Sequence, residues 1–272
     1  MYRTLRSFIT SIFLCAAFSS EAQEVTDWAL RAVECEYTAY NAEDPREAAE
    51  ALVEKAYCYR QCGRYDEAAA TLGRVSMFQL APERRDSVLY EKELCSYLAG
   101  DFEGAASYME EAGVSGTPRR LLLDALVLGG CARWDESRAR AEKLVTLRYD
   151  GAEREAALQE LRDLYSNVPR LKKEGQAVLR SFLPPLGHLY TGHLSEGLAS
   201  MGLNAAAAGW VVWQCLGGNW ITGILGGGVA LNATFMGGME RSIELVDEYN
   251  RDAMLGFNAV LRDVLLSHGQ AE

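Results

Sequence analysis

Charge is almost missing from one part of this chain. Lys, Arg, Asp and Glu make up 24% of the sequence, yet Glu196 is the one such residue between positions 181 and 239. Two apolar runs lie in this stretch, over residues 197–216 and 220–236. A helix needs about 20 apolar residues to cross a bilayer, with a lower limit near 17. The pattern predicts a transmembrane helical hairpin over residues 197–239. A helical pair buried in a soluble core is the alternative, because both runs are rich in Gly and Ala.

The sequence also lacks the patterns typical of enzymes. It has three histidines, and it contains no nucleophile elbow, no phosphate-binding loop and no HExxH zinc helix. His188 and His193 are not spaced to share one helical face, and no third metal ligand lies near them. We therefore expect no enzymatic activity, no catalytic residues, no metal site and no cofactor.

The net charge limits the partners. The formal charge of −11 disfavours the phosphate backbone of nucleic acids, so no nucleic-acid partner is expected. An acidic surface favours protein partners instead.

The first residues have the composition of an export signal. Two arginines precede an apolar stretch over residues 8–18, and small residues at Ser20 and Ala22 occupy the positions that a signal peptidase reads. We expect residues 1–22 to be removed and the next domain to lie in the periplasm of a bacterial envelope. Cys15 leaves a lipoprotein as an alternative, although the residue before it is large.

Residues 24–168 have a helical pattern that repeats itself. The segment GRYDEA at 63–68 recurs as GDFEGA at 100–105 and more loosely as ARWDES at 132–137. Each copy has a turn residue, an aromatic and a small residue, and the signature positions are Gly63, Tyr65, Ala68, Gly100, Phe102, Ala105 and Trp134. This pattern resembles the tetratricopeptide repeat, a helix-turn-helix unit of about 34 residues in which the aromatic wedges between the helices.

The resemblance implies three stacked units near 49–85, 86–117 and 118–151, flanked by helices at 28–40 and 152–165. One helical pair cannot bury its apolar stripe alone, so at least three stack. The resemblance further implies an all-α solenoid that binds a protein partner through its repeats. The three signature aromatics are expected to occupy one equivalent buried site.

Cysteine positions follow the same register. Cys58 and Cys95 share one repeat position, and Cys62 and Cys131 share another. This favours small apolar residues packed between helices. Disulfides stay open as an alternative, because sequence cannot choose among pairings.

A second motif joins the two parts. Residues 183–197, LPPLGHLYTGHLSEG, resemble the Pro-Gly-x-Gly-Gln-x-Tyr-x-Gly pattern that opens bacterial membrane domains of the two-transmembrane domain superfamily. The motif residues are Pro184, Pro185, Gly187, His188, Tyr190, Gly192, His193 and Gly197. The prolines should stop the preceding helix, the first two glycines should allow a tight bend, and the Tyr and His rings suit a membrane–water interface. Residues 169–196 are therefore read as an amphipathic linker with an interfacial motif.

Small residues are arranged in faces along both hairpin helices. The faces are Ser200, Asn204 and Ala208 on the first helix, and Gly223, Gly227, Ala230, Thr234 and Gly238 on the second. Such faces let helix backbones approach closely in lipid, with Asn204 or Asn232 able to hydrogen-bond across the contact. The neighbour is either the other half of the hairpin or another protein, in a homo- or hetero-oligomer.

Residues 240–272 are predicted to form an amphipathic helix that lies on the membrane or caps the repeats. Its apolar side is expected to comprise Ile243, Val246, Ala253, Phe257, Val260, Leu261 and Val264. Together these features favour a membrane-anchored envelope scaffold, most simply in the inner membrane, whose periplasmic repeats bind a protein partner. An accessory factor for the assembly of membrane proteins or envelope complexes is the alternative. An envelope hydrolase is a more remote one.

Overall fold

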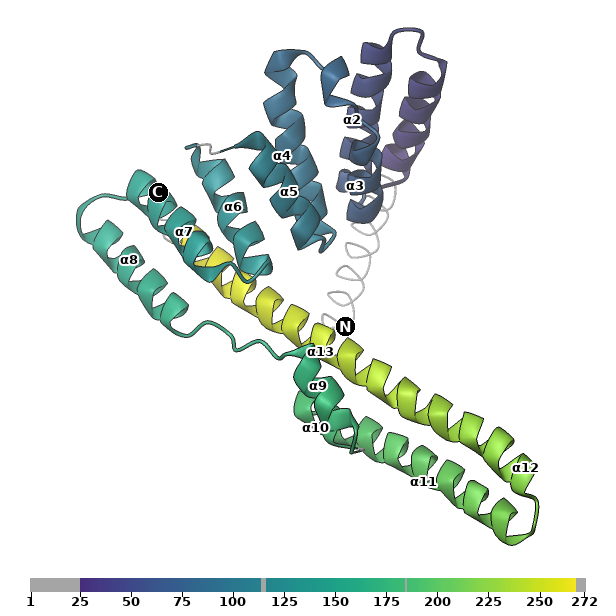
Figure 1. Ribbon diagram of the computed structural model, residues 1–272. Helices are drawn as coiled ribbons and strands as arrows, with labels where there is room; N and C mark the ends of the chain where they lie inside the picture. Colours follow the sequence, from purple (N-terminus) through teal and green to yellow (C-terminus); the bar gives the residue numbers. More distant parts are fainter. Residues whose placement is uncertain (1–24, 114–115, 184, 268–272) are drawn as a thin grey trace, which may run out of the picture. The chain divides into compact units, whose positions relative to one another are not determined.

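The computed structural model describes residues 25–113, 116–183 and 185–267, and within these ranges the chain forms helices and no strand (Figure 1). The all-α prediction is confirmed. The chain divides inside one helix into two compact units, the first ending at Leu161 and the second beginning at Arg162. The predicted signal segment, residues 1–22, lies outside the described residues.

The first unit is a series of helical pairs. After a helix over residues 25–41 come α2 (Pro45–Gln61), α3 (Tyr65–Gly73), the 3₁₀ turn η1 (Met77–Gln79), α4 (Pro82–Leu98), α5 (Phe102–Ala112), α6 (Pro118–Gly130), α7 (Trp134–Arg148) and α8 (Gly151–Ser166). Helices α2, α4 and α6 each begin at a proline, where the missing N–H would have no intrahelical partner. Each proline therefore opens the first helix of a pair.

One turn geometry recurs in the pairs α2/α3, α4/α5 and α6/α7. Gly63, Gly100 and Ala132 have positive φ values of 70°, 83° and 56°. In each turn the N–H of the next residue donates to the carbonyl five residues earlier, at 2.9 Å. This is the Schellman arrangement that caps a helix C-terminus. Ala132 adopts the left-handed conformation without being a glycine, so this turn is strained.

The small residue of each repeat is fully enclosed. Ala68, Ala105 and Ser137 are each 0% exposed. Ser137 replaces alanine without leaving its hydroxyl unsatisfied, because the hydroxyl donates to the carbonyl of Ala125 at 2.7 Å.

The signature aromatics are less alike than expected. Each begins the second helix of its pair, yet Phe102 is buried whereas Tyr65 and Trp134 are only half-buried. The ring of Phe102 is covered by α6, where a Cβ added to Gly130 would lie 2.6 Å from the ring. The expectation of one equivalent buried site is wrong in this respect, because the neighbouring pair encloses each aromatic to a different degree.

A buried cluster of charges links α4, α6 and α7. The Nη2 atom of Arg120 lies 2.8 Å from Oε2 of Glu93, and its Nε lies 3.7 Å from Oδ1 of Asp124. Arg140 reaches the other oxygen of Asp124 at 3.9 Å. Burial, reinforced by Asp124 and opposed by Arg120, raises the pKa of Glu93 to about 8. Two buried carboxyls thus share one buried guanidinium, and burial favours the protonated form of each carboxyl.

The second unit is built on one long helix. It contains the end of α8, α9 (Glu174–Ser181), α10 (Leu186–Thr191), α11 (Leu194–Leu216), α12 (Trp220–Thr222), the π-helical segment η2 (Gly223–Gly227) and α13 (Gly228–Ser267). Helices α9, α10 and α11 all contact α13. A separate helix starting at residue 240 was expected, but α13 runs through this position for 40 residues, because no proline or cap interrupts it there.

The apolar side of α13 beyond residue 240 is mostly as expected. Phe257 and Leu261 are buried, and the ring of Tyr165 packs edge-on against Phe257 at 5.2 Å between centroids. Val260 was assigned to the same side but is 50% exposed. It lies about 100° around the helix from Leu261, which turns it away from that contact.

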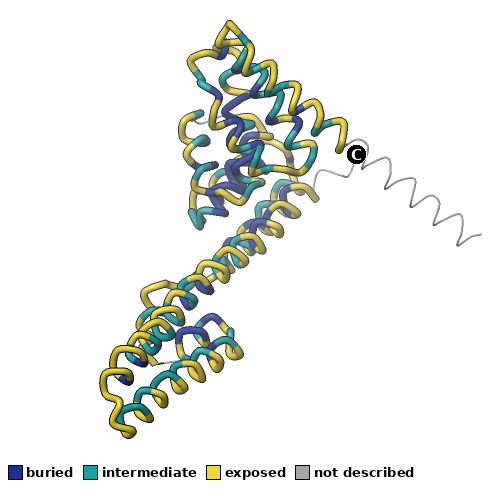
Figure 2. The backbone as a smooth tube through the Cα atoms, turned by 90° about the vertical axis from the view of Figure 1, so that its right-hand side faces the viewer, coloured by how far each residue is buried: buried dark blue, intermediate teal, exposed yellow. Residues whose placement is uncertain are grey.

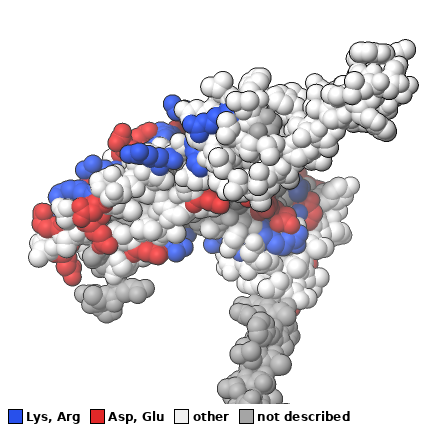
Figure 3. Space-filling model, turned by 90° about the horizontal axis from the view of Figure 1, so that it is seen from below, with Lys and Arg blue, Asp and Glu red and all other residues white. Residues whose placement is uncertain are grey.

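Among the described residues, one helix is long and apolar enough to cross a membrane, Trp220–Ser267, and only 11% of its apolar window is buried. Helix α11 has 23 residues, but Ser, Asn and Gln side chains among them make it less apolar. In Figure 2 the tube of α11 is mostly exposed, and that of the first half of α13 is mostly exposed or intermediate. In Figure 3 the end of this helical pair shows neither acidic nor basic side chains.

Candidate functional site

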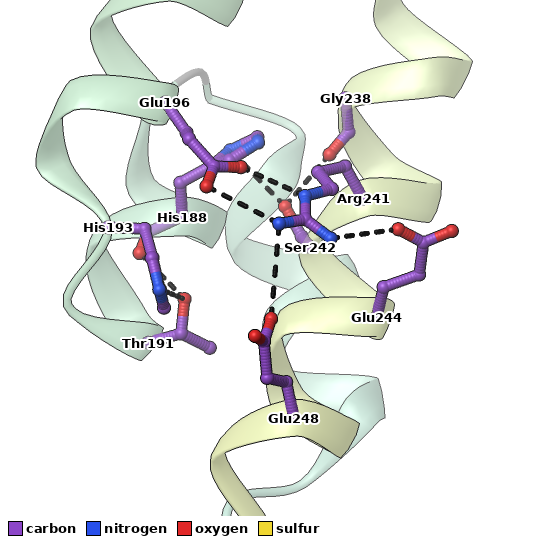
Figure 4. A network of polar contacts seen from close by, with 9 residues as sticks. All are labelled: His188, Thr191, His193, Glu196, Gly238, Arg241, Ser242, Glu244 and Glu248. Carbon is purple, nitrogen blue, oxygen red and sulfur yellow. Dashed lines mark hydrogen bonds and ion pairs between the residues drawn. The ribbon is translucent and has the colours of Figure 1, made fainter. Parts of the chain in front are cut away.

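Side chains of the junction motif pack closely against α13 near the start of α11 (Figure 4). His188 is only 4% exposed, and its Nδ1 lies 3.3 Å from the hydroxyl of Ser242 on α13. That hydroxyl donates to the carbonyl of Gly238 at 2.9 Å. Burial lowers the pKa of His188, while the charge of Glu196 opposes this shift. The expected interfacial role is wrong for His188, because protein encloses its ring.

Glycines in the motif serve close packing more than bending. Gly187 lies inside α10, and a Cβ there would meet the hydroxyls of Ser181 and Ser242, the latter at 2.7 Å. A Cβ on Gly197 would lie 2.7 Å from Cβ of Pro185. The expected bend at Gly187 is therefore wrong. Gly192 does provide one, since its φ of 93° ends α10.

The remaining motif residues contact different neighbours. Pro184 lies outside the described residues, and Pro185 caps the start of α10. The Nδ1 of His193 lies 3.3 Å from the hydroxyl of Thr191, and the hydroxyl of Tyr190 donates to Gln176 at 3.0 Å. No group of three potential metal ligands exists in the part of the chain that the structure describes.

Glu196, the lone charge of the apolar stretch, is paired. Arg241 of α13 donates to its carboxylate from Nε at 2.9 Å and also contacts Glu244 at 3.1 Å and Glu248 at 3.9 Å (Figure 4). The hydrogen bond from Arg241 holds the pKa of Glu196 below its usual range. This pair joins the two helices where their charge-free segments begin.

The small-residue face of α11 meets the face formed by η2 and α13. A Cβ on Gly223 would lie 3.1 Å from Sγ of Cys215, and one on Gly227 would clash with the side chain of Val211. Further along, the hydroxyl of Thr234 donates to Oδ1 of Asn204 at 3.0 Å. These contacts lie within the chain, so the neighbour of each face is the other helix of the pair.

The other residues of these faces also lie along the contact between the two helices. A Cβ on Gly238 would lie 2.6 Å from the hydroxyl of Ser200, which brings the two ends of the faces together. Ala208 and Ala230 are half-buried. The opposite sides of both helices are exposed and apolar, with Leu203, Trp213 and Val229 at 60%, 70% and 70% exposure.

A groove opens between α2 and α4 of the first unit. Its volume is about 250 Å³, enough for one or two side chains rather than a large ligand. Apolar residues floor it and charged ones rim it, and the lining includes Val53, Glu54, Tyr57, Arg84, Ser87, Val88 and Glu91. Sequence reasoning expected a partner surface on the repeats without locating it. The sequence feature that could have located this surface is the recurring turn, because it places the first helices of successive pairs side by side.

The groove carries a definite charge pattern. Arg84 pairs with Glu50 at 2.9 Å, and Glu91 is held by Arg60 at 3.3 Å. The guanidinium of Arg60 also stacks on the ring of Tyr57, 5.1 Å from its centroid. These contacts hold the rim residues in place before a partner binds.

The six described cysteines are free thiols, and the structure contains no disulfide among them. Cys58 and Cys95 are 0% and 1% exposed. Burial raises the pKa of both thiols to about 11, which keeps them protonated and unreactive. They pack as small apolar residues, as their shared repeat position indicates.

No protein-family model, no curated protein and no solved structure matches the chain. Function therefore has to be argued from the chain's own geometry.

Proposed function

We propose that this protein is a membrane-anchored scaffold of the bacterial cell envelope, whose tetratricopeptide-like repeat unit binds a segment of a protein partner. The groove between α2 and α4 carries this proposal. It has an apolar floor for a side chain, and charged residues on its rim are already held by ion pairs. An extended peptide with one bulky apolar residue flanked by charges would fill it.

The stack of pairs supports the same function. Apolar cores pass from one pair to the next, since one cluster joins residues of α2, α3 and α4 and a second joins α5 to α6. This continuity is what a solenoid needs in order to hold a rigid binding surface.

The membrane anchor in this proposal is the helical pair α11 and α12–α13, crossing the bilayer twice. Its contacting faces are small and polar, and its outward faces are apolar and charge-free, which is the arrangement that lipid favours. Two crossings put both ends of the chain on one side, the periplasmic side if residues 1–22 act as an export signal. The anchor predicts resistance to carbonate and high-salt extraction, and release by either wash contradicts it.

The partner site is tested by filling the groove. Ser87→Trp places a large ring in the lining of the groove, whereas Ser107→Trp places the same ring on an exposed position of α5. We expect the first change alone to abolish co-purification of proteins from envelope membranes solubilised in mild detergent. Identical protein sets with both variants would exclude the groove. A partner that is itself a newly made membrane protein would point to a role in assembly.

A further inference from the structure

Several cations of the second unit, Arg170 and Arg251 among them, have no acidic partner among the described residues, and three of them lie on or near α9. Lys172, Lys173 and Arg180 form no ion pair with any acidic residue that the structure describes, in a chain whose net charge is −11. Arg241, in the same unit, contacts three glutamates. Glu174 is the nearest acid in sequence, and it forms no pair with them. Positive charge that no acidic side chain compensates can attract an anion.

The first cation is fixed in place by α13. The side-chain amide of Asn250 accepts from the backbone N–H of Lys172 at 2.7 Å and donates to its carbonyl at 2.9 Å. The ammonium of Lys172 lies 3.6 Å from the ring centroid of Tyr249. An aromatic ring holds the cation without neutralising it, so the charge stays available to an anion.

Tyr190 brings Arg180 close to Lys172 and contacts the backbone of Lys173. Its ring lies 4.0 Å from the guanidinium carbon of Arg180 and 5.4 Å from the ammonium of Lys172. Its hydroxyl accepts from the backbone N–H of Lys173 at 3.3 Å. Burial, together with the charge of Arg180, lowers the pKa of Lys172. The charges of Lys172 and Arg180 are thus held close together by the fold, and Lys173 follows Lys172 in the chain.

The cluster adjoins the apolar surface of the helical pair. Ser181, next to Arg180, shares with Ser242 the space around Gly187. Glu240 is the first charged residue after the apolar half of α13. Ser242 lies two residues beyond it, which is about 3 Å along the helix. Arg180 is therefore level with the edge of the charge-free segment.

Exposed apolar side chains flank the same cation. Leu179, Phe182 and Leu183 are 72%, 60% and 68% exposed. The ring of Phe182 lies 6.0 Å from that of Phe235, on the apolar half of α13. A ligand that touches both groups needs an anionic head and an apolar body.

We propose that Lys172, Lys173 and Arg180 bind the phosphate of an anionic phospholipid headgroup. The cations donate charge-assisted hydrogen bonds to the phosphate oxygens, and the exposed leucines and Phe182 contact the acyl chains. Free phosphate would satisfy only the first of these contacts, which favours the lipid as its source. The proposal rests on the membrane anchor proposed above. Each basic residue near an anionic membrane surface strengthens binding by roughly fivefold.

The test uses the full mature chain in a neutral detergent, with lipid binding followed by native mass spectrometry. Phosphatidylglycerol is expected to bind more tightly than phosphatidylcholine. Arg180→Gln should weaken phosphatidylglycerol binding by roughly fivefold and leave phosphatidylcholine binding unchanged. Arg262→Gln is the matched control, since Arg262 is paired with Asp263 and lies about 20 Å further along α13 than Tyr249. Arg180→Lys should restore most of the binding.

Equal affinities for the two lipids, or equal losses with Arg180→Gln and Arg262→Gln, overturn the proposal. Displacement of the lipid by inorganic phosphate at an equal concentration would assign the cluster to a soluble anion, and this also overturns it. Circular dichroism checks that each variant keeps its helix content. Carbonate extraction tests the anchor separately, so failure of the lipid site and failure of the anchor give different results.

Discussion

Removal of Arg120 is the sharpest test of how the repeat unit is held together. Arg120→Met keeps a long, flexible side chain but deletes the guanidinium that lies between Glu93 and Asp124, which are 0% and 1% exposed. Deleting one partner of a buried ion pair typically costs about 3–5 kcal/mol, because the other charge stays buried and unpaired. This is a large share of the roughly 5–15 kcal/mol that stabilises a domain.

Proton uptake moderates the cost at pH 7. Glu93 already has its pKa raised to about 8, so it can stay neutral, and Asp124 carries most of the penalty. We therefore expect the lower end of the range, about 3 kcal/mol at pH 7, and a larger loss at pH 9. With a urea dependence of about 1–3 kcal/mol per molar, the midpoint should fall by roughly 1–3 M.

Urea unfolding of a fragment covering residues 24–168, followed by far-UV circular dichroism, measures this shift. Arg119→Met is the matched control, because the neighbouring Arg119 side chain is 68% exposed and its contact with Glu91 is long, at 3.9 Å. That change should stay within about 1 kcal/mol of the parent. Equal midpoints for the two variants, or a gain in stability with Arg120→Met, would refute the reasoning.

Three further predictions concern single positions. Glu93→Gln should remove a pH dependence of the unfolding free energy. With a folded-state pKa near 8, the contribution of Glu93 to the stability of the parent is fully present below about pH 4.3 and is lost as the pH rises through 8. Urea unfolding between about pH 5 and 9 should show this loss in the parent and not in the variant. Ala132→Gly should stabilise the repeat fragment by roughly 1 kcal/mol, since φ is 56° there, and an unchanged urea midpoint would mean that this turn is not strained. Gly227→Val should lower the melting temperature of the whole chain in detergent, because the new side chain meets Val211, while Gly226→Val faces open space and should not; equal melting temperatures would contradict the packing of α11 against η2.

Much of the fold could be predicted because it depends on local pattern. The turn residues at 63, 100 and 132 predict the helical pairs, because the left-handed backbone that ends a helix depends on only a few neighbouring residues. The small residues on the two apolar helices likewise follow from helical spacing alone. Periodicity shows that a face exists, and the structure shows that the two faces meet.

The candidate site was harder to foresee, because its contacts join distant parts of the chain. Lys172 meets Tyr249 and Asn250, and Glu93 meets Arg120, through contacts that no local spacing encodes. In the sequence, Asp124 is a single charge within the otherwise apolar run at 121–130, and this does not show which residue it meets. His188 looked suited to an interface because a ring with polar nitrogens is common there, and only packing shows that it is buried.

The sequence by itself determined the helical class, the repeated turn and the charge-free stretch that can enter a membrane. These depend on backbone preferences and on hydrophobic periodicity, which act over a few residues. The tertiary structure alone decided that α13 is continuous, that Gly187 and Gly197 are needed for close approach, and that cations from separate segments gather without a counter-ion. Those features depend on which surfaces meet when the helices pack, and packing brings together residues that lie far apart in the chain.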